Sequence, residues 1–499
     1  MPLPFNTLPP NLRIPLFYAE IDNSQASYFV NNNRALIIGQ KLPAGTAPAD
    51  VPVLVTSNDQ AIAYFGRGSM LQRMVAAYRA NDDFGELWCI PVDDLGAGVA
   101  ATKTLTIGGP ATAAGVIPLY LAGQRLQVGV AAADTDADIA TAIAAAVNAA
   151  PDQPYTAVAA AEVVTLTARH KGLVGNDLDV RVAYLGQSGG EVLPAGVTVV
   201  IADGVAGAGN PDLTAAIAAM GDEPYDYIAV PWTDAASLDA LKAEMNDATG
   251  RWSPLRMIYG HVFAAKVASH ASLVTLGTGR NDPHATIFGF YNTPTPGYEI
   301  AASATAVAAR SLNIDPARPL QTLPLTGVLQ PPSGSRFTLQ ERNILAYGGI
   351  ATLMVSGGYV RLERVITTYQ KNAYDQTDPS FLNVTTVANL AYIVRFLRQR
   401  ITQKFGRHKL AADGTAFGAG DAVVTPKVIR AELIAAYVEL IGLGLVENLA
   451  AFTANLIVEI NQNDPSRLDV LFAPDLVNEL NIVALLVQFR QQYPAAQAA

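Results

Sequence analysis

The strongest constraint on the fold is a repeated order of short apolar runs and capped helices near the start of the chain. The runs 35–40 and 87–92 have the length and composition of buried strands. Between them, Ser69 with Gln72 has the spacing of a helix capping box, as does an earlier Ser/Gln pair. Apolar residues then recur every three or four positions, so one helix face packs inward. A strand, two helices and a strand predict an α/β layer.

This layer continues beyond a change in composition. Between 96 and 205, short Thr/Val/Ile runs and glycine-rich turns flank one helix, which starts at a Thr135/Asp138 capping box. We interpret 96–205 as an inserted small α+β domain. Helices and apolar runs then alternate again, and the runs expected to be strands are 225–231, 256–260 and 285–290. The α/β domain is therefore expected to comprise residues 31–95 and 206–334.

Residues 335–479 are expected to form a separate C-terminal α+β core domain. A helix-like run at 339–347 stops at a Gly-Gly pair and gives way to strand chemistry rich in Val, Ile, Thr and Tyr. A later helix carries an apolar stripe, and another takes Thr425 as its cap and Pro426 as its first residue. The chain as a whole is predicted to be multidomain, α/β and α+β.

Both ends of the chain have the pattern of strands. Residues 14–21 alternate loosely, and their proline is typical of an edge strand. Residues 481–489 are apolar on both faces, and such a strand needs partners on both sides. We therefore expect extended arms at 1–30 and 480–499 that pair with other molecules. The alternative is an ordinary edge strand within one chain.

Composition narrows the classes of partner. Charged residues make up 15% of the chain, against about 25% in an average soluble protein, which indicates a surface covered by neighbouring subunits. A net charge of −10 argues against nucleic acid, because phosphate binding needs a dense basic face. A single cysteine allows no internal disulfide. Without a secretory signal or an uninterrupted apolar span, the protein is expected to be cytosolic and not inserted in a membrane.

No motif for catalysis or metal binding is complete. Ser188 lies in a G-x-S-x-G pattern, but turn and strand chemistry follows it where a nucleophile elbow needs a helix. Asp282 and His284 form an acid–imidazole pair without a located nucleophile. The five histidines never fall at ligand spacing with Cys or carboxylates. We expect no enzyme, cofactor or metal, and keep a hydrolase using Ser188 or the Asp282/His284 pair as the enzymatic alternative.

The stretch 358–369 has the order Gly-x-Val-x-x-Glu-Arg-x-Ile-Thr-Thr-Tyr and is followed by Asp378 and an amphipathic helix. It resembles the C-terminal region of contractile-phage tail sheath proteins of the Mu-like group, and the resemblance extends from 11–16 to 461–469. It implies a structural subunit that stacks in helical rings around a tail tube and contracts to drive the tube through the host envelope for genome delivery. It also implies a subtilisin-like fold without activity for the α/β domain.

The resemblance further implies arms that add strands to the sheets of neighbouring subunits. The arm residues expected on this basis are Ile14, Leu16, Tyr18, Ile21, Val483, Leu485, Val487 and Phe489. For the tube contact we expect the charged face of Arg395, Arg398 and Lys404, because a charged contact slips more readily than an apolar one; a solvated face explains it equally well. Contraction would use the energy difference between two packings of one sequence.

The expected partners are further copies of the chain, a tail tube protein, and baseplate and tail terminator proteins. The expected location is a virion tail that is made and assembled in the host cytoplasm. A non-contractile structural protein, such as a surface-layer or adhesin module, is the remaining alternative.

Overall fold

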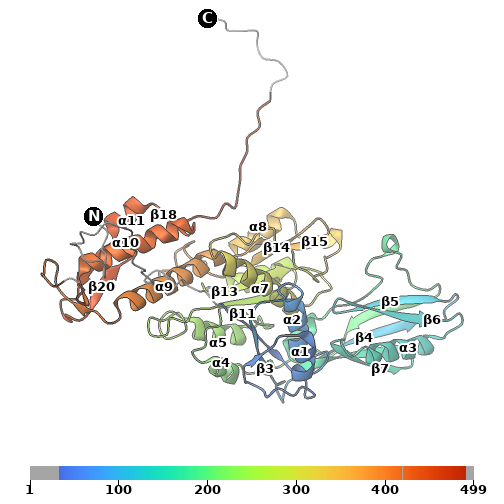
Figure 1. The fold of residues 1–499 in the computed structure, drawn as a ribbon. Coiled ribbons are helices and arrows are strands. Elements are labelled where there is room, and N and C mark those ends of the chain that lie inside the picture. Colours follow the sequence, from blue (N-terminus) through green and yellow to red (C-terminus); the bar gives the residue numbers. More distant parts are fainter. Residues whose placement is uncertain (1–32, 419, 490–499) are drawn as a thin grey trace, which may run out of the picture. The chain divides into compact units, whose positions relative to one another are not determined.

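The computed structural model describes residues 33–418 and 420–489. The expected arm residues Ile14, Leu16, Tyr18 and Ile21 lie outside this part of the chain. The chain divides into two compact units (Figure 1). The first comprises residues up to 316 together with 320–399, and the second comprises 317–319 together with residues from 400 onward.

An eight-stranded sheet forms the centre of the first unit, in the order β15-β14-β13-β12-β11-β1-β3-β2. Its inner strands from β14 to β3 are parallel to one another, and the two edge strands, β15 and β2, are antiparallel to their neighbours. The strands are β1 Ala35–Gln40, β2 Val53–Leu54, β3 Leu87–Val92, β11 Tyr227–Ala229, β12 His261–Val267, β13 Ala285–Phe290, β14 Ala351–Ser356 and β15 Tyr359–Arg364.

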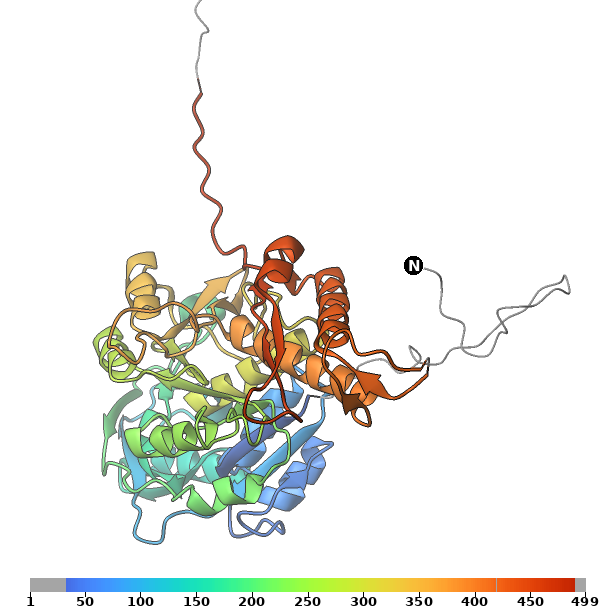
Figure 2. The same ribbon diagram turned by 90° about the vertical axis from the view of Figure 1, so that its left-hand side faces the viewer.

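Helices cover both faces of this sheet (Figures 1 and 2). Alternate residues of β1 show why: Ile37 packs in the core that contains α2, whereas Leu36 and Ile38 pack in the core that contains α4 and α5. A strand buried on both faces must be apolar throughout, as 35–40 is. The helices of the layer are α1 Asn58–Phe65, α2 Met70–Arg79, α4 Thr214–Met220, α5 Ala235–Met245, α6 His270–Thr278, α7 Gly297–Ile314 and α8 Leu339–Tyr347.

Residues 96–205 form two antiparallel sheets and one helix, inserted between strands of the central sheet. One sheet has the order β10-β4-β8-β7 and the other β6-β5-β9. The helix begins with the complete Thr135/Asp138 capping box. The elements are β4 Ala100–Gly108, β5 Gly115–Leu121, β6 Gln124–Val130, α3 Asp136–Ala149, β7 Tyr155–Ala160, β8 Val163–Lys171, β9 Val180–Val182 and β10 Thr198–Asp203, with 3-10 turns at Leu173–Asp177 and Gln187–Gly189.

The expected domain boundary at 334/335 does not coincide with a structural one. Strand β14 pairs with β13 in parallel register, with Phe288 opposite Ala351, so residues 351–364 complete the central sheet. The first unit accordingly continues to Gln399. The sequence predicted the change from helix to strand, but it did not indicate that the new strands belong to the central sheet.

The expected strand at 256–260 was wrong. These residues are turn and irregular structure before β12, which starts at His261. Met257 and Tyr259 have φ angles of 49° and 60°, which a strand cannot accommodate. The carbonyl and the ring of Tyr259 instead make contacts with Arg251 and Arg395.

The second unit is built on helix α10 and a small aromatic core. The rings of Tyr437 and Phe452 stack with centroids 3.7 Å apart, and Phe472 lies edge-on to both. Helix α9, Val384–Phe405, belongs to the first unit up to Gln399 and to the second from Arg400. The remaining elements are β16 Lys409–Leu410, β17 Val423–Val424, α10 Pro426–Gly442, β18 Val446–Glu447, α11 Leu449–Asn455, β19 Ile457–Ile460, β20 Leu468–Leu471 and β21 Asp475–Leu476, with a 3-10 turn at Ser333–Ser335 in the first unit.

Candidate interaction sites

The last described segment, residues 477–489, has neither helix nor strand in the single chain (Figure 1). Its large apolar side chains beyond position 479 are between 69% and 84% exposed, namely Leu480, Ile482, Val483, Leu485, Leu486, Val487 and Phe489. The strand expected at 481–489 is therefore absent from the isolated chain. An apolar segment that is open to water on all sides indicates a surface that another molecule covers.

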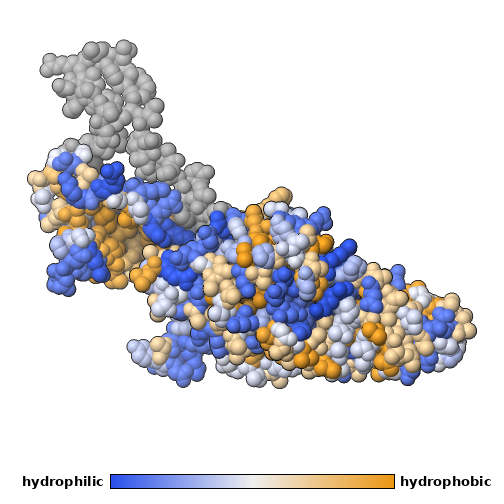
Figure 3. Space-filling view, turned by 90° about the horizontal axis from the view of Figure 1, so that it is seen from below, coloured by the Kyte–Doolittle hydropathy of each residue, from blue (hydrophilic) through white to orange (hydrophobic). Residues whose placement is uncertain are grey.

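Strands β19 and β20 form a two-stranded sheet in the second unit, with Val458 opposite Val470. Within the described residues no further strand pairs with either edge. The hairpin carries Ile457, Val470 and Leu471 at 42–56% exposure, and the space-filling view shows hydrophobic side chains gathered on this unit (Figure 3). A two-stranded sheet alone is at best marginally stable, so these open edges can accept further strands.

The chain enters the described part at Asn33 and Arg34, and these two residues are held against the amino end of β11. The Arg34 backbone N–H donates to Asp226 Oδ2 at 3.1 Å, and Asn33 Nδ2 donates to the Tyr227 hydroxyl at 3.3 Å. The Arg34 side chain forms ion pairs with Glu86 and Glu223. The start of the described chain is thus fixed in the first unit.

The three cations expected to face a tube differ in their surroundings. Arg395 forms an ion pair with the buried Asp226 at 2.5 Å, and Lys404 forms one with Glu432 at 2.8 Å. Arg398, by contrast, is exposed. Burial raises the pKa of Asp226, and the Arg395 guanidinium opposes this shift. Arg395 and Lys404 therefore have anionic partners within their own chain.

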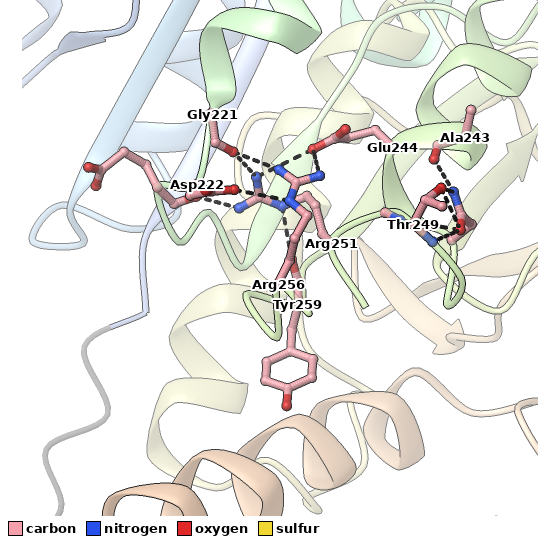
Figure 4. A network of polar contacts seen from close by, with 11 residues as sticks. Gly221, Asp222, Ala243, Glu244, Thr249, Arg251, Arg256 and Tyr259 are labelled. Atoms are coloured by element: carbon pink, nitrogen blue, oxygen red, sulfur yellow. Dashed lines mark hydrogen bonds and ion pairs between the residues drawn. The ribbon is translucent and has the colours of Figure 1, made fainter. Parts of the chain in front are cut away.

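A buried arginine shapes the loop beside Arg395 (Figure 4). Arg251 is fully buried and donates to the carbonyl oxygens of Tyr259 at 3.0 Å and Gly221 at 3.1 Å, and also to that of Glu223. Its neighbour Arg256 also donates to the Gly221 carbonyl, at 2.9 Å. Figure 4 shows the Tyr259 ring pointing toward helix α9, where the Arg395 guanidinium lies 5.2 Å from the ring centre.

The residues that suggested a hydrolase are not assembled as one. Ser188 is exposed in the 3-10 turn and lies 3.4 Å from the Leu185 carbonyl oxygen. Asp282 accepts the backbone N–H of His284, while the His284 imidazole pairs with Asp247 at 3.0 Å and stacks on Trp252. Both residues therefore hold the start of β13. Among residues 33–418 and 420–489, no cluster could hold a metal ion and no helix could span a bilayer.

Sequence reasoning missed Asp226, Arg251 and Tyr259. A weak signal existed for Asp226, which is the only charged residue in the expected strand 225–231. A lone acid at the start of a buried strand requires a cationic partner. Nothing in the sequence indicated which of the cations on a helix more than 150 residues later supplies it.

Comparison with known protein families gives three matches along the chain. The profile of the phage tail sheath protein beta-sandwich domain matches residues 96–198, and that of the phage tail sheath protein central domain matches residues 206–368. The profile of the phage tail sheath C-terminal domain matches residues 376–490.

A full-length relative and several solved structures are also similar to this chain. The Mu-like prophage FluMu tail sheath protein of Haemophilus influenzae is 42% identical over 98% of this chain and 100% of its own length. Crystal structures of sheath tail proteins from Desulfitobacterium hafniense and Listeria innocua are 14% and 13% identical. Their TM-scores are 0.47 and 0.49, and they cover 93% and 92% of this chain and 100% and 95% of their own.

Proposed function

Because the chain belongs to the phage tail sheath protein family, we propose that its two ends join it to neighbouring copies by adding strands to their sheets. It is a structural subunit of a contractile tail sheath and a component of the virion tail, not an enzyme. Membership of this family excludes the two alternative functions, a hydrolase and a non-contractile surface protein. What remains to be found is how copies of this chain hold one another.

The proposal is carried by two features that have no strand partner among the described residues. The segment 477–489 supplies exposed apolar residues in an extended stretch, and the β19–β20 hairpin supplies open strand edges. Strand addition pairs the backbone N–H and C=O groups of the segment with those at a hairpin edge, and it covers Val483, Leu485 and Val487. Ladder bonds fix the register of a strand while they tolerate rotation between the bodies it joins, which suits a lattice that must change its packing.

The N-terminal arm is the second link in the proposal. Ile14, Leu16, Tyr18 and Ile21 lie outside the described residues, and their strand pattern supports pairing with another copy. Asn33 is anchored on the first unit, so about 30 residues of arm can span on the order of 100 Å when extended. That reach is sufficient to cross a neighbouring subunit.

Truncations test both arms. We expect chains that lack residues 1–21 or 480–499 to stay soluble and unassembled, because each deletion removes one strand donor. Deletion of 490–499 alone is the matched control, since it keeps the apolar segment through Phe489 and should still form sheaths. Negative-stain microscopy of purified protein gives the readout. Full sheaths from either longer truncation would show that the arms are not the links.

For the tube contact we propose the cations of helix α9, Arg395, Arg398 and Lys404, with Arg398 as the exposed one. Arg398→Glu should abolish co-assembly with the tube protein while the sheath subunit still polymerises by itself. Lys427→Glu, on an exposed position of α10, is the control for an equal change in charge. Unchanged co-assembly of the Arg398→Glu chain, measured by sedimentation with preformed tubes, would remove this assignment.

We further propose that the baseplate and tail terminator proteins cap the two ends of the sheath and that assembly takes place in the host cytoplasm. The low share of charged residues supports a subunit that is mostly enclosed by other copies. Chemical crosslinking of tails from infected cells, followed by mass spectrometry, tests these contacts.

A further inference from the structure

One buried carboxylate binds two parts of the chain that lie far apart in the sequence. Asp226 is 7% exposed, and its Oδ2 accepts the backbone N–H of Arg34 at 3.1 Å. Its Oδ1 forms the 2.5 Å ion pair with Arg395 of helix α9. Asp226 thus connects the root of the N-terminal arm directly to the helix.

Arg395 completes this connection with the rest of its guanidinium group. Nη1 donates to Asn33 Oδ1 at 3.1 Å, and Nη2 donates to the Ile258 carbonyl at 2.9 Å. The group also lies against the ring of Tyr259. The planar guanidinium group holds several N–H donors in a fixed geometry and binds three acceptors at once. A lysine ammonium on a flexible side chain does not reproduce this arrangement.

The loop that supplies Ile258 and Tyr259 is held rigidly from behind. Arg251 binds the Tyr259 carbonyl (Figure 4). The Trp252 and Tyr259 rings pack edge to face at 4.8 Å. The positive φ angle of Tyr259 turns its ring toward α9. The Arg395 site is therefore built before the arm engages any partner.

Helix α9 is fixed a second time shortly after Arg395. Arg400 forms ion pairs with Glu432 and with Glu439, and Lys404 pairs with Glu432 at 2.8 Å. All of these partners belong to the second unit. Arg395 and Arg400 are about 7.5 Å apart along the helix axis.

We propose that Asp226 and Arg395 are positioning residues of the assembled sheath, which transmit strain on the N-terminal arm to helix α9. The proposal rests on the arm function proposed above. When a neighbouring copy binds the arm, the arm root can move only if Asp226 and Arg395 move with it. Engagement of the arm therefore tightens the part of α9 that belongs to the first unit.

Hydrogen exchange of the full chain tests this coupling. We compare assembled sheaths with dissociated subunits, for the wild type and for the double variant Asp226→Asn/Arg395→Met. In this variant the asparagine oxygen still accepts the Arg34 N–H, but the ion pair with helix α9 is lost. In the wild type, assembly should slow exchange of amides 391–399 by about tenfold or more; in the double variant the slowing should fall below about threefold. Residues 14–21 should be protected equally in both sheaths.

A matched control and a milder variant keep the outcome clear. Arg342→Met/Glu363→Gln removes another half-buried ion pair of the first unit, between α8 and β15, and should behave like the wild type. Arg395→Lys keeps the charge and should give an intermediate effect if the double variant does not fold. Equal slowing of 391–399 in wild type and variants would overturn the proposal. Unprotected residues 14–21 in wild-type sheaths would instead contradict the arm function itself.

Discussion

At the scale of single residues, buried charges decide the shape of the loop from 246 to 260. Arg251 is fully buried, and its donors satisfy the carbonyls of Gly221, Glu223 and Tyr259, with Glu244 3.7 Å away as its counter-ion. A buried charge is tolerated only when it is paired and hydrogen-bonded in this way. The loop therefore depends on one side chain.

Replacing Arg251 by Met should lower the free energy of unfolding of the first unit by about 3 kcal/mol or more, because several buried acceptors lose their donor. Arg256→Met is the matched control; its side chain is 24% exposed, and we expect a loss of about 1 kcal/mol. Urea unfolding followed by tryptophan fluorescence reports on this unit, which contains all three tryptophans. Equal losses in the two variants would refute the assignment.

His261 should make the first unit sensitive to acid. Burial lowers the pKa of this imidazole to about 3, with the nearby His284 acting in the same direction, and its Nδ1 has no hydrogen-bond partner within residues 33–418 and 420–489. The unfolded chain binds the proton near pH 6.5, so stability is complete above that pH and is lost as the pH falls toward 3. Between pH 7 and pH 4 the loss from His261 should be about 3 kcal/mol.

His261→Gln should remove much of this slope, since glutamine does not titrate and can still bond to Thr286, which His261 Nε2 contacts at 2.8 Å. The measurement is the urea midpoint at several pH values. An unchanged pH slope in the variant would place the acid sensitivity on other groups.

At the scale of elements, close approach between α6 and the end of α8 requires a glycine inside a helix. A Cβ atom added to Gly277 would lie 2.1 Å from the Gly348 carbonyl oxygen. The capping box of α8, made by Thr338 and Glu341, and the Gly348-Gly349 pair fix the ends of that helix. The position of α8 therefore depends on the close backbone contact at Gly277 as well as on the packing of its buried residue Leu345.

Gly277→Ala should destabilise the first unit by about 2 kcal/mol, although alanine normally favours a helix by up to about 1 kcal/mol. Gly279→Ala, at the end of the same helix, meets nothing closer than 3.4 Å and should be neutral or slightly stabilising. Thermal unfolding measured by circular dichroism compares the two. A stable Gly277→Ala variant would show that α8 can move aside.

At the scale of the whole molecule, the inserted sheets are part of the core of the first unit. The core cluster around α2 continues into Leu119, Ile139 and Tyr155 of the insertion. Arg73 of α2 donates to the carbonyl oxygens of Ala122 at 2.9 Å and Asp152 at 3.0 Å and pairs with Glu299 of α7. The insertion is thus attached through a buried surface as well as by the two chain segments that connect it to the rest of the unit.

Deleting residues 100–206 should therefore lower the unfolding temperature by about 10 °C or more or give insoluble protein, even though the flanking Val99 and Ala208 already pair with each other. The reason is that Arg73 loses two of its acceptors and the apolar face of α2 becomes exposed. Ser188→Ala at the exposed turn of the insertion is the control and should leave stability unchanged. Solubility and differential scanning fluorimetry provide the readout.

The sequence alone determined the elements whose physical signal is local. The buried runs 35–40 and 285–290, the Thr135/Asp138 capping box and the Pro426 helix start were all predicted and appear at these positions. The family was also identified from residues 358–369. These features depend on hydrophobic period, caps and a fixed motif, which are written in adjacent residues.

Only the tertiary structure decided which distant segments meet. It placed β14 and β15 in the central sheet and gave 256–260 a turn conformation. It also assigned Arg395 to Asp226, and it gave 481–489 no strand partner among the residues it describes. The reason is that strand register and ion pairing depend on groups far away in the sequence, 169 residues apart for Asp226 and Arg395, and no local pattern encodes them.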